Sequence, residues 1–303
     1  MLLSVITPVF NTPSRYLDDL ASSLHAAVDG VAWEWLLVDD HSDDADTLAC
    51  LDRLAQRPGV VRMTNTSGKG AANTRNTGAA QARGELLAFV DADDIPVPRA
   101  LAQLAQTMEA SPDIRWLAGD YDTFTDEHPP SDPPMASAAM DCVVEHWPDA
   151  ARRLIFETPF SQGSYVVRRQ LFDDVGGFDE RFVIGEDWYL WMRLAARGEL
   201  YFCQLTVLYK RRGHPSTMSG SAATGDAVVA PYLAARRDPL FAAHHKVLRW
   251  RIYKLYRLLA ERNQAIAQHA RATRYAGLSA LWGINDGKQW LNLLRAMARK
   301  PLR

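Results

Sequence analysis

Cysteine is scarce in this sequence, and long apolar runs are missing from it. The three cysteines, Cys50, Cys142 and Cys203, lie far apart and form no Cys-x-x-Cys pair. This usage gives no disulfide framework and is typical of a reducing compartment. No uncharged apolar run approaches the roughly 20 residues that a membrane-spanning helix needs. We therefore expect a cytoplasmic protein, either soluble or peripheral at the inner face of the membrane.

Two N-terminal signatures are also absent. Residues 1–6 lack a basic start, and their apolar run breaks at Pro8 and Asn11, which predicts a first buried strand rather than a signal peptide. Residues 7–13 contain no glycine. A dinucleotide oxidoreductase carries a GxGxxG loop at this place, so the sequence excludes that class.

Charge is nearly balanced over the whole chain but is unevenly distributed. The net charge is −2, yet the segment from Arg236 to Arg303 holds 15 Lys or Arg against three Asp or Glu, so it carries +12 and the remainder −14. The basic segment predicts a polyanionic neighbour, such as a membrane surface or a phosphate-bearing acceptor. The alternative is that its helices pack on the rest of the chain or form a homodimer contact.

One acidic stretch organises the sequence. The apolar run that begins at Gly84 has the length of a strand and ends in three carboxylates, Asp91, Asp93 and Asp94. Burying several anions together is costly without a compensating cation. The stretch therefore predicts ligation of a hard metal ion at the carboxyl edge of a sheet. The alternative is a solvated turn, which Asp also favours.

Strands and helices alternate through the first third of the chain. We expect strands at 2–6, 33–38 and 60–63, helices at 14–28, 45–56 and 71–83, and a fourth strand that ends at the acidic stretch. This order predicts an α/β fold with a largely parallel, doubly wound sheet. Ligands bind such sheets at the carboxyl ends of the strands, where the polar clusters 8–11, 39–44 and 91–94 fall.

Further elements are expected downstream of the acidic stretch. They are helices at 96–108 and from Gly185, strands at 116–119, 164–167 and 205–209, and a helical pattern from about residue 230. The predicted division is a domain at 1–225 and a helical, basic C-terminal extension at 226–303.

Five short motifs resemble those of family 2 glycosyltransferases, which have the GT-A fold. They are Val5–Asn11, Leu37–Ser42, Arg75–Gly78, Phe89–Asp94 and Gly185–Trp188, in the family's order and approximate spacing. The resemblance covers roughly residues 2–220. It implies a GT-A fold, which is Rossmann-like, doubly wound and mostly parallel, in a nucleotide-sugar-dependent enzyme.

The resemblance implies a nucleotide site at the edge of the sheet. The residues that would hold the donor are Pro8, Phe10, Asn11, Asp40, Arg75, Asn76 and Asp91. Phe10 offers a surface for the base, although packing in the core is the alternative. Asp39 is expected to be structural. Lys69 lies between two glycines before a helix, which suits a diphosphate, but exposed lysines are usually only solvated.

The resemblance also identifies Asp91-Ala92-Asp93 as the family's DxD signature. Alternation in an extended segment points Asp91 and Asp93 to the same side. Asp93 or Asp94 would bind Mn²⁺ or Mg²⁺, and Asp91 would hold the ribose. His214 is a further candidate metal ligand or phosphate contact, with a solvated histidine as the alternative.

Glu186 and Asp187 resemble the family's ED motif. An inverting transfer needs one base that takes the proton of the acceptor hydroxyl, and the resemblance assigns this role to Asp187. Glu186 would orient it or bind sugar hydroxyls, and Trp188 would pack against a sugar. The alternative is that the two acids only complement the helix dipole.

The expected function is therefore a metal-dependent, inverting hexosyl or N-acetylhexosaminyl transfer. The donor would be a nucleotide-sugar, with a UDP-sugar favoured, and the acceptor a glycan or a lipid-linked sugar in bacterial surface polysaccharide biosynthesis. The Gln-x-x-Arg-Trp motif of processive members is absent, which indicates addition of one or a few sugars. A non-catalytic nucleotide-sugar-binding module is the alternative.

Overall fold

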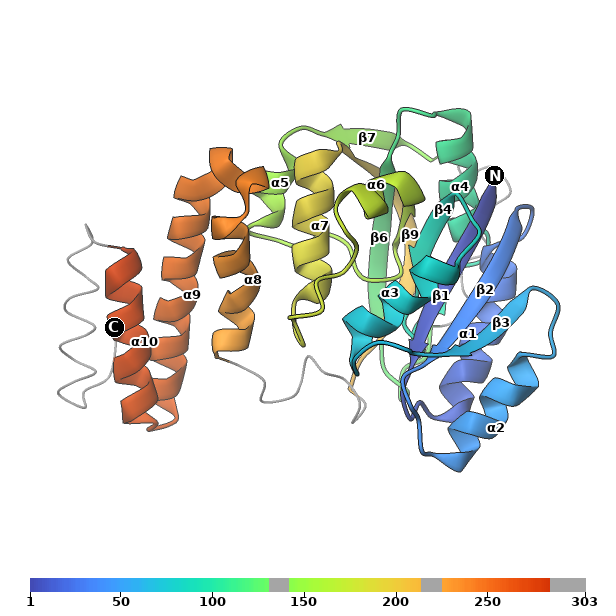
Figure 1. Cartoon of the computed structure of the whole chain (residues 1–303), viewed down its shortest axis with the longest axis horizontal. Helices are drawn as coiled ribbons and strands as arrows, with labels where there is room; N and C mark the ends of the chain where they lie inside the picture. The colour runs from blue at the N-terminus through green and yellow to red at the C-terminus, as the bar shows by residue number, and fades with distance from the viewer. Residues whose placement is uncertain (131–141, 214–224, 284–303) are drawn as a thin grey trace. The chain divides into compact units, whose positions relative to one another are not determined.

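The computed structural model describes residues 1–130, 142–213 and 225–283 (Figure 1). The chain divides into two compact units. The larger unit contains residues 1–150 and 158–221, and the smaller one contains residues 151–157 and 222–303.

A mixed sheet of nine strands forms the centre of the larger unit. The strands are β1 (Leu2–Val9), β2 (Ala32–Asp39), β3 (Val60–Thr64), β4 (Leu86–Phe89), β5 (Ile95–Pro96), β6 (Trp116–Phe124), β7 (Val144–Trp147), β8 (Tyr165–Arg168) and β9 (Leu200–Arg211). Their order in the sheet is β3-β2-β1-β4-β8-β6-β9-β5, and β7 also pairs with β9.

The two halves of this sheet differ in strand direction. β3, β2, β1 and β4 are parallel neighbours, as the sequence predicts for a doubly wound sheet. In the other half β8 runs antiparallel to both β4 and β6, and β9 runs parallel to β6. The short strands β5 and β7 are antiparallel to β9. The α/β fold class is confirmed, and antiparallel pairs complete the sheet.

Helices alternate with the strands along the chain of the larger unit and lie beside the sheet (Figure 1). They are α1 (Ser14–Ala27), α2 (Ala45–Leu54), α3 (Ala71–Gln81), α4 (Ala100–Ala110), α6 (Arg169–Asp174) and α7 (Glu186–Arg197), and α5 (Ala150–Leu154) begins at the division between the units. In α1, Leu17, Leu20 and Leu24 recur at helical spacing and are fully buried. Such a stripe lets the helix cover an apolar sheet.

The helix predicted at 96–108 begins four residues later. Ile95 and Pro96 pair with β9 as the short strand β5, and Arg99 then adopts the left-handed conformation with φ of 60°. Pairing with a strand more than 100 residues downstream outweighs the local helical pattern, so α4 starts only at Ala100.

The carboxyl ends of the parallel strands meet at one edge of the sheet. Val9 at the end of β1 lies beside Asp39 at the end of β2, and Ile6 lies beside Phe89 at the end of β4. The polar residues that follow each strand therefore emerge at the same edge. This confirms the expected convergence of the three polar clusters.

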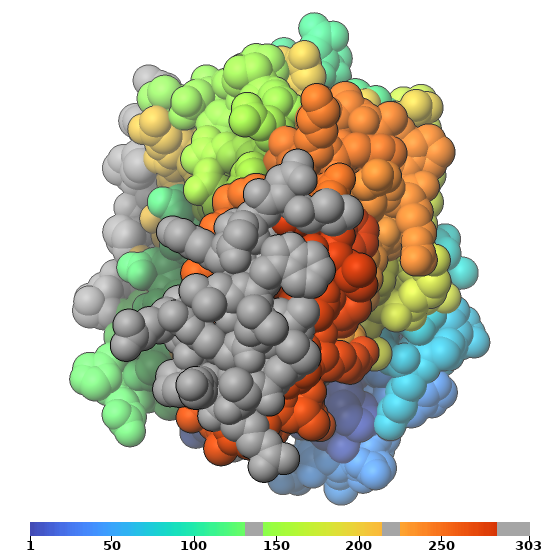
Figure 2. Space-filling view, turned by 90° about the vertical axis from the view of Figure 1, so that its left-hand side faces the viewer, coloured from blue at the N-terminus to red at the C-terminus, as the bar shows by residue number. Residues whose placement is uncertain are grey.

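The smaller unit is helical over its described residues. It contains α8 (Asp226–Arg237), the 3-10 helix η2 (Pro239–His244), α9 (His245–Ala265) and α10 (His269–Trp282). Leu248, Ile252, Leu255 and Leu259 form the buried stripe of α9, as their spacing predicts. Atoms of α10, red in Figure 2, lie at the surface. Among the described residues, no helix combines the length and apolarity that crossing a membrane requires.

Two of the three cysteines are paired, in contrast to the expectation from the sequence. Cys142 and Cys203 form a disulfide with their Cα atoms 5.6 Å apart, although 61 residues separate them. The antiparallel register of β7 with β9 sets Val144 opposite Cys203, and this brings Cys142 close. Cys50 is free and buried.

Gly78 provides a first test of the packing of α3 on the sheet. A Cβ atom at Gly78 would lie 2.5 Å from Cγ2 of Ile6 and 2.9 Å from Cγ2 of Val38. We expect Gly78→Ala to lower the free energy of unfolding by about 1–2 kcal/mol, because overpacking outweighs the gain in helix propensity. Gln81→Ala, on the exposed side of the same helix, should change it by less than about 0.5 kcal/mol. Urea unfolding measures both, and a G78A protein as stable as the parent would contradict the close packing.

Candidate active site

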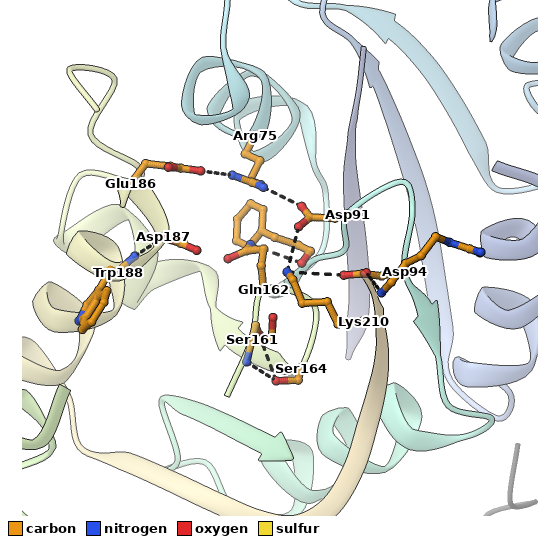
Figure 3. A network of polar contacts seen from close by, with 12 residues as sticks. Arg75, Asp91, Asp94, Ser161, Gln162, Ser164, Glu186, Asp187, Trp188 and Lys210 are labelled. Carbon is orange, nitrogen blue, oxygen red and sulfur yellow. Dashed lines mark hydrogen bonds and ion pairs between the residues drawn. The ribbon is translucent and has the colours of Figure 1, made fainter. Parts of the chain in front are cut away.

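The guanidinium of Arg75 lies at the centre of a network of polar contacts (Figure 3). It is carried by α3 and is almost fully buried. One of its nitrogens donates to Asp91 Oδ1 at 2.6 Å, and the other donates to Glu186 Oε1 at 3.0 Å. Burial alone would lower the pKa of Arg75, but the two carboxylates outweigh it and raise the pKa. Arg75 therefore joins the end of β4 to the start of α7.

Three carboxylates after β4 could hold a metal ion. Ligand oxygens of Asp91, Asp93 and Asp94 all lie within 4.8 Å of one another. Asp94 is buried, and its Oδ1 accepts a hydrogen bond from the backbone N–H of Arg211 at 2.9 Å. Its Oδ2 is buried without a hydrogen-bond partner. A buried oxygen in this position and an all-oxygen donor set fit Mg²⁺ or Mn²⁺.

Burial raises the pKa of Asp94, and the charges of Asp93 and Asp91 add to this effect. Burial would also raise the pKa of Asp91, but Arg75 and Lys210 outweigh it and lower the pKa. Asp91 and Asp94 thus differ in electrostatic environment although they are close in sequence. Asp91 is paired with Arg75 at 2.6 Å, whereas the cation contact of Asp94 is the longer one to Lys210, at 3.9 Å.

Lys210 is a site residue that the sequence prediction missed. Its Nζ lies 3.8 Å from Asp91 Oδ2 and 3.9 Å from Asp94 Oδ2. Burial lowers its pKa, but the neighbouring carboxylates outweigh this, so the pKa is raised. The predicted last strand ends at Tyr209, whereas β9 continues to Arg211 and brings Lys210 beside the acids. The basic run that follows Tyr209 is the signal that could have identified it.

Glu186 and Asp187 occupy the first turn of α7, after Gly185, whose φ is 80°. Oδ1 of Asp187 accepts a hydrogen bond from the backbone N–H of Trp188 at 2.6 Å. Burial and the charge of Asp187 raise the pKa of Glu186 to about 7. Burial also raises the pKa of Asp187. The pair therefore binds protons more readily than ordinary carboxyl groups do, and Figure 3 shows that it faces Arg75 and Asp91.

Phe10 presents an exposed aromatic surface where β1 ends. It is 48% exposed, so packing in the core does not explain it. The Lys69 ammonium lies 4.2 Å from its ring centroid. Pro8, two residues earlier in β1, is half-buried. An aromatic ring beside a cation at this edge could contact a base and a phosphate.

Asn11 and Asp40 hold loops together. The side chain of Asn11 accepts from the backbone N–H groups of Asp43 and Asp44 at 3.0 and 3.1 Å, and it donates to Asp43 Oδ1 at 2.7 Å. Asp40 accepts from Asn65 Nδ2 at 2.7 Å and from the backbone N–H of Gly70 at 2.9 Å. Asp40 thereby orders the Gly68–Gly70 segment. Nucleotide contacts of these two residues stay predictions.

Four further residues were predicted from the sequence, and the structure describes three of them. Asn76 donates to the Phe178 carbonyl at 2.9 Å and accepts from the Phe178 backbone N–H at 2.9 Å, so it fixes the turn before α7. Trp188 is half-buried beside Asp187. His214 lies outside the described residues. Asp39 accepts from the backbone N–H of Ser42 at 3.0 Å, which is a structural contact.

Gln162 and Arg211 also belong to this region and were not predicted. Gln162 is 2% exposed, and its Nε2 donates to the carbonyl of Phe89 at the end of β4, at 3.4 Å. Arg211 Nε donates to the carbonyl of Asp93 at 2.9 Å. No motif marks Gln162. Arg211 belongs to the basic run that also contains Lys210.

The chain is similar to known glycosyltransferases. Residues 4–141 match the family model described as Glycosyl transferase family 2. The chain is 29% identical over 223 residues to the O-antigen biosynthesis protein RfbC of Myxococcus xanthus, over 73% of this chain and 16% of that protein. It therefore spans less than a quarter of the length of RfbC.

A second relative is of similar length. The chain is 26% identical over 193 residues to UDP-Glc:alpha-D-GlcNAc-diphosphoundecaprenol beta-1,3-glucosyltransferase WfgD of Escherichia coli, over 64% of this chain and 69% of that protein. Among solved structures, TarS 1-349 of S. aureus in complex with UDP-GlcNAc has a TM-score of 0.68 at 19% identity, over 99% of this chain and 88% of that chain. This likeness confirms the GT-A fold.

Arg75 should be essential for the stability of the larger unit. Arg75→Met removes the cation that Asp91 and Glu186 share, and we expect it to lower the free energy of unfolding by about 3 kcal/mol. The matched control is Arg53→Met, because Arg53 pairs with Asp18 at the surface, where their side chains are 52% and 46% exposed. That substitution should cost less than about 1 kcal/mol. Urea unfolding tests both, and equal losses would contradict a special role for Arg75.

Proposed function

We propose that this chain, a member of glycosyl transferase family 2, transfers a hexosyl or N-acetylhexosaminyl group from a nucleotide-sugar to an acceptor hydroxyl. The observation that carries the proposal is the shared cation of the site. Arg75 joins Asp91, in the candidate metal cluster, to Glu186, the neighbour of the candidate base Asp187. A donor group and a proton acceptor are thereby held close together, as glycosyl transfer requires.

Names of relatives support the donor and acceptor classes. TarS was solved in complex with UDP-GlcNAc, and the name of WfgD specifies UDP-Glc and a lipid-linked acceptor. RfbC is named for O-antigen biosynthesis. We therefore infer a UDP-sugar donor and a glycan or lipid-linked acceptor in bacterial surface polysaccharide biosynthesis. Work on such an acceptor fits a cytoplasmic protein at the inner face of the membrane, where the basic C-terminal helices would contact lipid or a second subunit.

Asp187 is the proposed base. Its Oδ1 is occupied by the backbone N–H of Trp188, which leaves Oδ2 to accept the proton of the acceptor hydroxyl. The acceptor oxygen then forms a bond to the anomeric carbon while the bond from that carbon to the diphosphate breaks. A single displacement inverts the anomeric configuration. Burial raises the pKa of Asp187, which makes it a stronger base than an exposed aspartate.

The other residues bind and orient the donor. Phe10 offers its exposed ring to the nucleobase of the donor. Lys69 lies beside this ring and would contact a phosphate of the donor. Asp91, Asp93 and Asp94 would hold Mn²⁺ or Mg²⁺. Such an ion, when bound, neutralises the diphosphate and the charge that develops as the nucleoside diphosphate departs.

Asp187→Asn should abolish transfer and leave donor binding nearly intact. The amide cannot take the proton, so we expect the transfer rate to fall by about a thousandfold. Transfer is measured with UDP-sugars and a lipid-linked acceptor, and UDP binding by calorimetry. The control is Asp46→Asn, because Asp46 is an exposed first-turn acid of α2. Normal turnover by D187N would overturn the assignment of the base.

A thermal-shift screen tests the donor and the metal together. UDP, GDP, dTDP and CDP are each added with and without Mn²⁺, and a ligand that binds only the folded protein raises its melting temperature. We expect the largest rise with UDP plus Mn²⁺. Asp93→Ala should remove the part of the rise that depends on Mn²⁺. No shift with any nucleotide would contradict the proposed donor site, and a rise that ignores Mn²⁺ would contradict the metal role.

A further inference from the structure

Helix α9 presents an exposed row of side chains on the side away from its buried stripe. Trp250 is 47% exposed and Leu258 is 59% exposed, and Lys254 lies between them in the sequence. Residues four apart lie on the same side of a helix, so these three form one row about two turns long. The row stays at the surface although α8 and α10 both pack on α9 (Figure 1).

A second aromatic ring enlarges the apolar part of this surface. Phe156, which belongs to the same unit, is 38% exposed, and its ring centroid lies 5.5 Å from that of Trp250 in an edge-to-face arrangement. Lys254 Nζ lies 5.0 Å from the Trp250 ring centroid. Exposed aromatic and aliphatic side chains mixed with cations are typical of a helix that lies in the headgroup region of a membrane.

Cations also extend the row at both ends. Lys246 lies four residues before Trp250, and Arg262 lies four residues after Leu258. Within the described part of the chain, no carboxylate pairs with Lys246, Lys254 or Arg262. The surface therefore keeps positive charge that its own unit does not neutralise.

The one acid of α9 does not change this balance. The helix contains six Lys or Arg, and its single carboxylate, Glu261, is paired with Arg257 at 2.8 Å. An anionic partner would therefore meet mostly cations on this side of the helix.

A second copy of this chain is a poor occupant of the surface. A twofold dimer brings the same patch of both subunits together, so Lys246, Lys254 and Arg262 would face their own counterparts. Like charges that oppose one another across an interface are unfavourable. An anionic lipid surface has the opposite charge, and it takes up exposed apolar side chains without requiring a complementary shape.

We propose that this face of α9 docks the protein on an anionic lipid surface. The apolar side chains of Phe156, Trp250 and Leu258 enter the headgroup region, and the three cations of the row contact lipid phosphates. The helix lies along the membrane plane and does not cross it. Of the two neighbours proposed above for the basic helices, lipid is thereby selected. Docking of this kind needs no nucleotide-sugar, so it can hold or fail independently of glycosyl transfer.

Sedimentation of the full chain with lipid vesicles tests the apolar part of the face. We expect binding to vesicles of phosphatidylglycerol and phosphatidylcholine in equal parts, and much weaker binding to phosphatidylcholine alone. Trp250→Ala should lower the partition coefficient by about tenfold, and Leu258→Ser by about fivefold, because each removes apolar surface that leaves water on docking. The matched control is Val61→Ser, because Val61 is 41% exposed on β3 of the larger unit. That substitution should leave binding unchanged.

Charge substitutions test the electrostatic part. Lys246→Gln and Lys254→Gln should each weaken binding to the anionic vesicles by about fivefold, and added salt should weaken the binding of the parent. Arg57→Gln removes an exposed cation of the larger unit and should leave binding unchanged. Equal effects of the three substitutions would contradict a docking face on α9.

Other outcomes would also overturn the proposal. They are equal binding to neutral and anionic vesicles, unchanged binding of both W250A and L258S, and self-association in ultracentrifugation that both substitutions abolish, which would make the face an interface between two copies. Urea unfolding shows whether W250A is folded, and if it is not, L258S and the lysine variants decide. A parent that binds vesicles but transfers no sugar would refute the proposed function and leave the docking face standing.

Discussion

The buried guanidinium of Arg75 determines how the candidate site is assembled. Asp91 ends the parallel half of the sheet, whereas Glu186 begins a helix 95 residues later in the chain. Two carboxylates taken from water toward the interior would repel one another, and a shared cation reverses that effect. Because Arg75 is held by α3, its position depends on the packing of that helix at Gly78. Helix packing and electrostatics are thus coupled in this protein.

Basic residues of this region have different structural tasks. Arg75 makes short hydrogen bonds and keeps two acidic segments together. Arg211 donates to the Asp94 carboxylate through its backbone N–H and to the Asp93 carbonyl through its side chain, and its guanidinium lies over the rings of Tyr16 and Phe124. Lys210 makes only long contacts. Guanidinium groups with several directed donors suit fixed roles, and a flexible ammonium suits a group that moves.

Local sequence patterns predicted the part of the fold that local interactions determine. The first strands and helices follow apolar periodicity, and the convergence of Asp40 and Asp91 follows from parallel topology. Lys210 was missed because the length of β9 depends on its pairing with distant strands. The same distant pairing brings Cys142 to Cys203.

A sequence motif also does not show whether a polar side chain is already hydrogen-bonded within the fold. Asn76 matches the resemblance by position, yet its amide holds the turn at Phe178. Conversely, Asp94 Oδ2 is left without a hydrogen bond although its residue is buried. Only the folded chain distinguishes an occupied side chain from an available one. The roles of Asp187, Asp93 and His214 stay predictions, and His214 lies outside the described residues.

The hydrogen bonds of Asn11 have a consequence for protein engineering. They tie the loop after β1 to the turn after β2, so the loop that carries Phe10 and the turn that follows Asp40 keep one relative geometry. A substitution in one of these loops, which would both lie near the nucleobase, therefore also affects the other loop. A library that randomises one loop alone would mostly yield variants with a broken turn. Replacing both loops together with the matching pair from another enzyme keeps hydrogen bonds of this kind. It is therefore the rational way to change which nucleobase the protein prefers.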